Sequence, residues 1–208
     1  GGVTISGGEV FCQPEFLDAL LTACEKVDIK VAVETNLSFP FAVIEPFLPR
    51  LDTLMFDLKH INPDKHTAHT GISNALVLDC LEKMRSTGIR KIARTPVVPG
   101  VNDDTATIAN IAGVVSGLNN LLYYELLNYN PLGHGKYQAL GIDGEKTIQR
   151  RPLSEERLGE LKAAAETAAP APFAEATFGP RSRAASTDRS MLPRTCSASP
   201  AQFTSGQV

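Results

Sequence analysis

The sequence predicts an α/β fold in which parallel strands alternate with amphipathic helices. Short apolar runs typical of strands occur at Val3–Ser6, Lys30–Thr35, Thr53–Leu58, Lys91–Val98 and Leu122–Asn128. Windows with apolar residues at helical spacing separate these runs, which is typical of strand–helix–strand crossovers. Such a chain forms either an open doubly wound sheet or part of a (β/α) barrel. Both architectures place functional residues at the carboxyl ends of strands.

Four helices are expected between and after the strands. Their predicted first residues or caps are Pro14, Ser73 or Asn74, Asp103 or Asp104, and Ser154. The second helix is expected to turn Leu76, Cys80, Leu81 and Met84 inward and to stop at Gly88. The fourth should run to about Ala168.

Composition limits the class of protein. The chain has 208 residues, with 20 Lys and Arg against 23 Asp and Glu, and its net charge of -3 argues against a nucleic-acid partner. With 43% hydrophobic and 21% charged residues, it resembles a soluble globular protein. No apolar run approaches the roughly 20 residues of a membrane span, and no signal-peptide pattern opens the chain. We therefore expect a cytoplasmic protein without a membrane partner.

The sequence divides into two parts near residue 169. Residues 1–168 carry the strand and helix patterns, whereas residues 169–208 are rich in Ala, Ser and Pro. We predict a low-complexity, largely disordered tail there, with one short strand around Phe173–Phe178. The chain begins at Gly1, and its first residues have a pattern typical of the interior of a domain, so we expect the chain to be a fragment of a longer protein.

The four cysteines are Cys12, Cys24, Cys80 and Cys196, and no two of them form a Cys-x-x-Cys pair. This spacing argues against a disulfide framework and against a self-contained zinc or iron–sulfur site. Cys24 and Cys80 fall at core positions of predicted helices, where a thiol behaves as a small hydrophobe.

Polar residues follow the first two predicted strands. Gly7, Gly8 and Glu9 come after the first, and paired glycines allow a ligand to approach the backbone while the carboxylate accepts a cationic or amino group. A simple turn is the alternative. Glu34 and Asn36 end the second strand, where a helix-capping turn is an equally good interpretation.

The next three strands end in charged or amide residues. Period-2 alternation puts Asp57 and Lys59 on one side of the third strand, as an ion pair or as a ligand site. Arg94 interrupts the apolar fourth strand, and either a salt bridge to Asp57, Glu9 or Glu34 or contact with an anion or peptide explains it. Asn128 and Asn130 after the fifth strand could bind a substrate or cap a loop.

The histidines receive no catalytic role. His66 is expected to pack or cap a loop. His60, His69 and His134 are expected to face solvent.

Taken together, these motifs resemble the radical S-adenosylmethionine (SAM) enzymes that activate glycyl radical enzymes. The resemblance rests on Thr4–Glu9, Glu34–Asn36, Asp57–Lys59, His66, Gly71–Asn74, Arg94, Val98–Asp103, Asn128–Gly133 and Lys136–Tyr137. Its most specific parts are Asp-x-Lys-x6-His-x4-Gly and the later Val-Pro-Gly-Val-Asn-Asp.

The resemblance implies a partial (β/α)6 TIM-like barrel and a radical mechanism. In that mechanism a 4Fe-4S cluster binds SAM, and reductive cleavage yields a 5′-deoxyadenosyl radical that abstracts hydrogen from a glycine of the partner, a glycyl radical enzyme. An electron donor such as flavodoxin or ferredoxin is also implied. The implied cofactor-binding residues are Gly7, Gly8, Glu9, Glu34, Asn36, Asp57, Lys59 and Asn130, and the implied catalytic residues are Lys59 and Arg94.

Two departures qualify the resemblance. The family's Cys-x3-Cys-x2-Cys loop and the strand before it have no counterpart here, so no metal ligand is assigned and the chain is expected to be an inactive portion of an activating enzyme. Asn130 stands where some members carry histidine. Two alternatives stay open: a cluster-free paralogue that binds a glycyl radical enzyme without catalysis, and a barrel enzyme that binds a phosphorylated metabolite.

Overall fold

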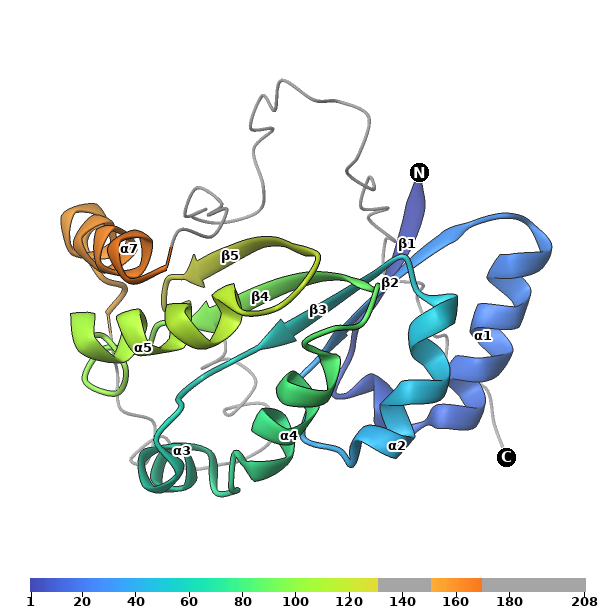
Figure 1. Cartoon of the computed structure of the whole chain (residues 1–208), viewed down its shortest axis with the longest axis horizontal. Helices are drawn as coiled ribbons and strands as arrows, with labels where there is room; N and C mark the ends of the chain where they lie inside the picture. Colours follow the sequence, from blue (N-terminus) through green and yellow to red (C-terminus); the bar gives the residue numbers. More distant parts are fainter. Residues whose placement is uncertain (131–150, 170–208) are drawn as a thin grey trace, which may run out of the picture.

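The computed structural model describes residues 1–130 and 151–169, which form a parallel sheet with helices along one side (Figure 1). The strands are β1 (Gly2–Ile5), β2 (Lys30–Thr35), β3 (Thr53–Asp57), β4 (Arg90–Pro96) and β5 (Leu121–Leu127). Every neighbouring pair is parallel, and the spatial order β1-β2-β3-β4-β5 repeats the order in the chain.

This strand order decides between the two predicted architectures. A doubly wound sheet reverses its order at a switch point, whereas a barrel adds each strand beside the previous one. The described strands never reverse, so the sheet has the topology of a partial TIM-like barrel.

The helices follow the strands as predicted, with local differences. They are α1 (Pro14–Lys26), α2 (Phe41–Ile44), α3 (Pro63–Thr70), α4 (Ala75–Met84), α5 (Thr105–Ser116) and α7 (Glu155–Ala168), with short 3-10 helices η1 (Val10–Cys12) and η2 (Glu45–Arg50). The predicted end of α4 at Gly88 is wrong, because the amide and hydroxyl of Thr87 both donate to the Met84 carbonyl and close the helix there. The prediction that Leu76 faces inward is also wrong, since Leu76 is 40% exposed and Val77 is buried instead.

Sequence analysis missed the helical segments α2, η2 and α3. The segment that holds α2 and η2 contains Pro46 and Pro49, which argue against helix in a sequence pattern. Helix α3 is polar throughout and buries only His66, so it has no apolar stripe to detect.

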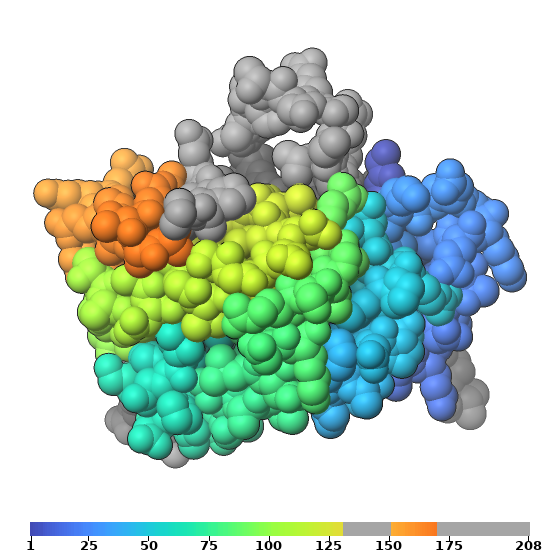
Figure 2. Space-filling view, in the orientation of Figure 1, coloured from blue at the N-terminus to red at the C-terminus, as the bar shows by residue number. Residues whose placement is uncertain are grey.

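The apolar faces of the helices cover the sheet and form the core. Leu17 and Leu21 of α1 and Ile108 and Ile111 of α5 are buried against strand residues such as Phe56. Helix α7 packs on α5, and Figure 2 shows the orange surface of α7 directly against the yellow-green surface of α5 and β5. None of the helices in residues 1–130 and 151–169 combines the length and hydropathy that a membrane span requires.

Candidate functional site

The carboxyl ends of β2, β3 and β4 bring three predicted site residues into contact. Arg94 lies beside Asp57 in the β3–β4 register. Its Nη2 donates to the Glu34 carboxylate and, at 3.3 Å, to Asp57 Oδ1. One guanidinium therefore links three neighbouring strands. Of the two roles considered for Arg94, the salt bridge is present, to Glu34 and Asp57 but not to Glu9 in the described residues.

Arg94 is held as a permanent cation. Its side chain is 12% exposed, so burial opposes the charge, but the hydrogen bond that it donates to Glu34 and the charges of Asp57, Glu34 and Glu125 outweigh burial and raise the pKa of Arg94. The Nε atom is buried without a hydrogen-bond partner among the described residues. The guanidinium thus keeps one donor that the described protein groups do not use.

Lys59 and Asp57 lie on the same side of the β3 terminus, as period-2 alternation predicted. Lys59 Nζ is 3.3 Å from Asp57 Oδ2. The Lys59 side chain is 38% exposed, against 23% for Asp57. The ammonium group is therefore accessible to an anionic group of a ligand while it remains beside a carboxylate.

Glu9 connects the ends of β1 and β2. Its Oε1 accepts hydrogen bonds from Phe11 N at 3.2 Å and Thr35 Oγ1 at 2.7 Å, and its Oε2 accepts from Asn36 N at 2.8 Å. The Asn36 side-chain oxygen in turn accepts from Ser38 N at 2.8 Å, which is the turn role considered from sequence. A carboxylate has about four acceptor positions, so Glu9 can accept one further donor.

The glycines that precede Glu9 border open space. A cavity of about 160 Å³ is lined by residues 5–10 and by one face of α1. A Cβ atom built at Gly7 or Gly8 would find no atom within 4 Å. A ligand can therefore approach the backbone of the β1 exit loop.

The two asparagines after β5 differ in position. Asn128 forms paired hydrogen bonds with the Leu153 backbone, donating to its carbonyl and accepting from its amide at 2.9 Å each. Asn128 thus caps a loop, one of the two roles considered. Asn130 is exposed beyond the end of β5, and its role in cofactor binding stays a prediction.

The structure corrects one expectation about the histidines. His60 was expected to face solvent but is 5% exposed, and its Nδ1 accepts a hydrogen bond from Asn62 N at 3.1 Å. Burial, followed by the charge of Lys65, lowers the pKa of His60. His66 bonds the Ile72 carbonyl at 2.8 Å, which confirms a loop-packing role, and His69 is exposed as predicted. His134 lies outside the described residues.

Sequence analysis assigned no site role to four buried polar residues near the site, although Asn74 was a candidate helix cap and Asn74 and Asn102 fall within motifs of the resemblance. They are Asn74, Thr95, Asn102 and Glu125, each at most 4% exposed. Glu125 is the register neighbour of Arg94 on β5. The other three bond loop carbonyls, and only their polar character beside predicted loops or strand ends could have indicated them.

The described residues fit one implied cofactor and not the other. SAM carries an ammonium, a carboxylate and ribose hydroxyls, and the site offers carboxylates, an exposed ammonium and open backbone at the glycines. An iron–sulfur cluster needs several thiolates together. Cys12 is exposed while Cys24 and Cys80 are buried in α1 and α4, and no group of metal-binding side chains occurs within residues 1–130 and 151–169.

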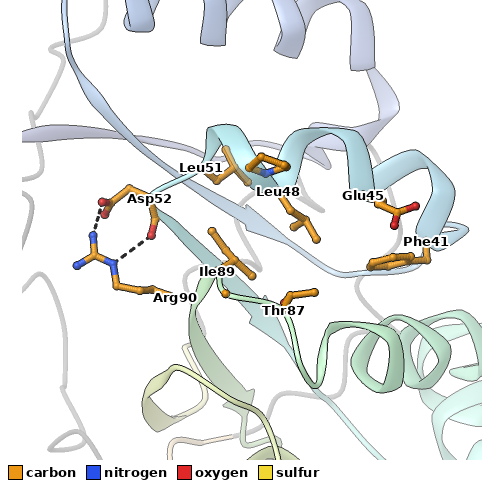
Figure 3. A pocket seen from close by; sticks show the side chains of 10 residues that line it. Phe41, Glu45, Leu48, Leu51, Asp52, Thr87, Ile89 and Arg90 are labelled. Atoms are coloured by element: carbon orange, nitrogen blue, oxygen red, sulfur yellow. Dashed lines mark hydrogen bonds and ion pairs between the residues drawn. The ribbon is translucent and has the colours of Figure 1, made fainter.

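A second cavity lies at the opposite end of the sheet. It measures about 600 Å³ and is bounded by Leu48, Leu51 and Ile89, near the amino ends of β3 and β4 (Figure 3). At one end of this cavity Arg90 is paired with the Asp52 carboxylate and bonds the Asp52 carbonyl. Arg90 and Asp52 thus bind each other, and Glu45 is the other charged residue that lines this cavity.

Comparison with known proteins identifies relatives of the chain. It is 38% identical over 146 residues to the (2S)-3-sulfopropanediol dehydratase activating enzyme of Klebsiella oxytoca, covering 68% of this chain and 45% of that protein. It is 34% identical over 143 residues to the pyruvate formate-lyase-activating enzyme of Clostridium pasteurianum, covering 69% and 60%. The chain therefore spans about half the length of the curated relatives it matches.

A solved structure supports the fold. A domain of pyruvate-formate lyase-activating enzyme from Bacteroides vulgatus superposes with a TM-score of 0.68 at 24% identity, covering 86% of this chain and 99% of that one. The family model described as the radical SAM superfamily matches residues 1–111. This segment holds every predicted site residue except Asn130. The chain belongs to the radical SAM superfamily, and the relatives named here are activating enzymes of glycyl radical enzymes.

Proposed function

We propose that this chain is the SAM-binding part of an enzyme that activates a glycyl radical enzyme. The observation that carries the proposal is the contact of Glu34, Asp57, Lys59 and Arg94 at the carboxyl ends of three adjacent strands. When bound, SAM would supply a 5′-deoxyadenosyl group for hydrogen abstraction from a partner glycine. The names of the relatives support this class of substrate.

Each charged residue has a role suited to its surroundings. Lys59 is exposed enough to bind the SAM carboxylate, and Asp57 beside it can accept from the ribose hydroxyls. The open backbone at Gly7 and Gly8, with Glu9, suits the methionine amino group. Glu34, Asn36 and Asn130 complete the proposed cofactor-binding set.

Arg94 has a role distinct from that of Lys59. Its guanidinium holds Glu34 and Asp57 in place, which prevents the two carboxylates from separating by charge repulsion. Its Nε, which is buried without a hydrogen-bond partner among the described residues, is proposed to donate to the cofactor or to the glycine loop of the partner. The described residues do not supply cluster ligands, so no electron-transfer step is assigned to them and residues 1–208 alone are proposed to be inactive.

We also propose the substrate protein, the electron donor and the cellular location of the reaction. The substrate is a glycine in the backbone of a second, larger protein, and the electron comes from a donor such as flavodoxin or ferredoxin. Cys12, Cys24 and Cys80 are free thiols, as is usual for proteins of the reducing cytoplasm, and this supports a cytoplasmic site for the reaction.

The test uses protein produced from its complete reading frame, purified anaerobically and reconstituted with iron and sulfide. Under reductant, the wild type should be brown and should release 5′-deoxyadenosine from SAM. Asp57→Ala and Lys59→Ala should each reduce release at least tenfold, because a hydrogen bond to a charged group contributes about 1.5–3 kcal/mol. An electron paramagnetic resonance spectrum of the partner would report the glycyl radical.

Lys83→Ala is the matched control for the lysine variant. Lys83 also forms an ion pair with an aspartate, Asp79 at 2.7 Å, but on the exposed face of α4. Its release should equal that of wild type. Full release by both site variants would refute the site assignment, and no release by wild type would refute the proposed function.

A further inference from the structure

The loop that carries Lys59 is held by buried side chains at four successive carbonyls. Residues 58–61 follow β3, and their carbonyl groups lie beyond the last registered pair of the sheet, Asp57 and Arg94. Each carbonyl instead accepts a hydrogen bond from a side chain of another segment: Leu58 O from Thr95 Oγ1 at 2.8 Å, Lys59 O from Asn102 Nδ2 at 2.9 Å, and His60 O and Ile61 O from Asn74 Nδ2 at 3.0 and 2.7 Å. We call Asn74, Thr95 and Asn102 the loop clamp.

The loop clamp is buried throughout. Thr95 is 0% exposed, Asn74 is 1% exposed and Asn102 is 2% exposed. Burial of an amide or hydroxyl is unfavourable unless its hydrogen bonds are made, so each clamp residue is stabilised in place by the carbonyl it binds. The loop conformation and the clamp geometry therefore depend on each other.

Asn102 couples this loop to the next one. Besides the Lys59 carbonyl, its Nδ2 donates to Pro96 O at 3.0 Å, and its Oδ1 accepts from Val98 N at 2.7 Å. One amide thus joins the exit loops of β3 and β4, the strands that carry Asp57 and Arg94. Thr95 is held from a third strand, because Tyr124 on β5 donates to its hydroxyl at 2.8 Å.

The Asn74 side chain bonds the loop after β3 and does not cap helix α4. As the residue before α4 it was expected to cap the helix, yet its side chain makes no cap hydrogen bond. Ser73 Oγ instead accepts from Ala75 N at 3.2 Å. The Asn74 amide is therefore committed to the loop that carries Lys59.

We propose that Asn102 and Asn74 are positioning residues that set where the Lys59 ammonium meets the SAM carboxylate. The proposal rests on the proposed function, in which Lys59 binds SAM. Lys59 has one ion-pair partner in the site and a partly exposed side chain, so the side chain alone does not fix its position. The position of the ammonium group is set instead by the loop backbone, which the hydrogen bonds of the loop clamp hold in place.

The test compares SAM binding by Asn102→Ala, Asn102→Asp and Asn74→Ala in the reconstituted protein from the complete reading frame. Asn102→Asp retains the acceptor for Val98 N but loses the donors to Lys59 O and Pro96 O. All three variants should raise the SAM dissociation constant at least tenfold by calorimetry. Hydrogen exchange of a peptide covering residues 57–62 should accelerate in each variant, a readout that needs no SAM.

Lys91→Met separates positioning from general stability. Lys91 also clamps three backbone carbonyls, those of Thr87, Ile89 and Asn119, but at the amino end of β4. This variant should melt at a lower temperature yet bind SAM within twofold of wild type. Weakened SAM binding by Lys91→Met equal to that of Asn102→Ala would refute positioning.

A double-mutant cycle isolates the route through Lys59. If Asn102 acts through Lys59, Asn102→Ala should cause little further loss in the Lys59→Ala background. An equal loss in both backgrounds, with normal wild-type binding, would overturn the positioning role alone. Absence of SAM binding by wild type would overturn the proposed function as well, and the exchange data would still report whether the clamp orders the loop.

Discussion

Strand β4 carries a buried lysine and a largely buried arginine, and the protein stabilises their charges by different means. Near the carboxyl end of β4, the Arg94 guanidinium forms ion pairs with the Glu34 and Asp57 carboxylates, at the end of the sheet where SAM is proposed to bind. Lys91 at its amino end is 0% exposed and donates to three carbonyls at 2.9–3.1 Å, and no carboxylate of the described residues forms an ion pair with it. The two ends of one strand therefore differ in electrostatic function.

Lys91 should make stability depend on alkaline pH. Burial lowers its pKa from 10.5 to about 8, so between these values the unfolded chain binds more protons than the folded chain. The free energy of unfolding should therefore rise as pH increases from 8 to 10.5, by about 1–3 kcal/mol relative to Lys91→Met. Urea denaturation of both proteins at each pH measures this difference.

The comparison with Lys91→Met is needed because another buried group acts in the opposite sense. Burial raises the pKa of Cys80 to about 11, so its thiol contributes a loss of stability as pH rises from 9 to 11. That contribution is common to both proteins and cancels in their difference. A difference that does not change with pH would show that Lys91 keeps its proton throughout.

At the scale of elements, helix starts show what sequence can predict. Ser154 and Asp104 were both expected to cap helices, and each accepts a hydrogen bond from the backbone amide three residues later. These caps are local and can be read from a few residues. Asn74 has the same residue preference, but its side chain bonds a loop 13–14 residues away in sequence, a choice that tertiary packing makes.

The α5 cap gives a prediction that distinguishes two neighbouring aspartates. Asp104 Oδ1 accepts from Thr107 N at 2.8 Å and its Oδ2 accepts from Thr107 Oγ1 at 2.7 Å. Asp104→Ala should lower the free energy of unfolding by about 1 kcal/mol, the usual effect of losing a cap. Chemical denaturation monitored by circular dichroism measures it.

Asp103→Ala is the control for the cap. The Asp103 carboxylate accepts an exposed hydrogen bond from Gly100 N, and the bond from Arg157 Nη2 goes to the Asp103 backbone carbonyl, which the substitution keeps. Asp103→Ala should therefore change stability by less than about 0.5 kcal/mol. Equal effects of the two variants would mean that Asp104 does not act as the cap.

At the scale of the whole molecule, the sequence predicted the class of sheet and a set of candidate site residues, but not which of those residues bond one another across strands. Glu34, Asp57 and Arg94 are up to 60 residues apart in sequence, and only the parallel register shows that Arg94 bonds both carboxylates. The strand and helix pattern alone left a doubly wound sheet and a barrel open, the resemblance implied a partial barrel, and the spatial strand order confirms the barrel. Such long-range relations leave no periodic signal in one sequence, whereas burial of apolar stripes does.

The sheet order also predicts how residues 1–208 behave in solution. In the described part of the chain, β1 pairs only with β2, so its other edge presents backbone groups that can pair with a second molecule. Val3 on this strand is 38% exposed. The chain should therefore self-associate at high concentration, and Val3→Lys should reduce association because a charged side chain disfavours strand pairing at an edge. Sedimentation velocity measures this change.

Phe16→Lys tests whether the edge or general apolar exposure drives association. Phe16 on α1 is 65% exposed, more than Val3, but it lies on a helix and offers no strand edge. If backbone pairing along β1 is the cause, Val3→Lys should shift the chain toward monomer and Phe16→Lys should leave the distribution almost unchanged. The reverse ranking would place the contact on the helical surface, because side-chain burial would then outweigh strand pairing. A wild-type chain that stays monomeric at every concentration would contradict both explanations.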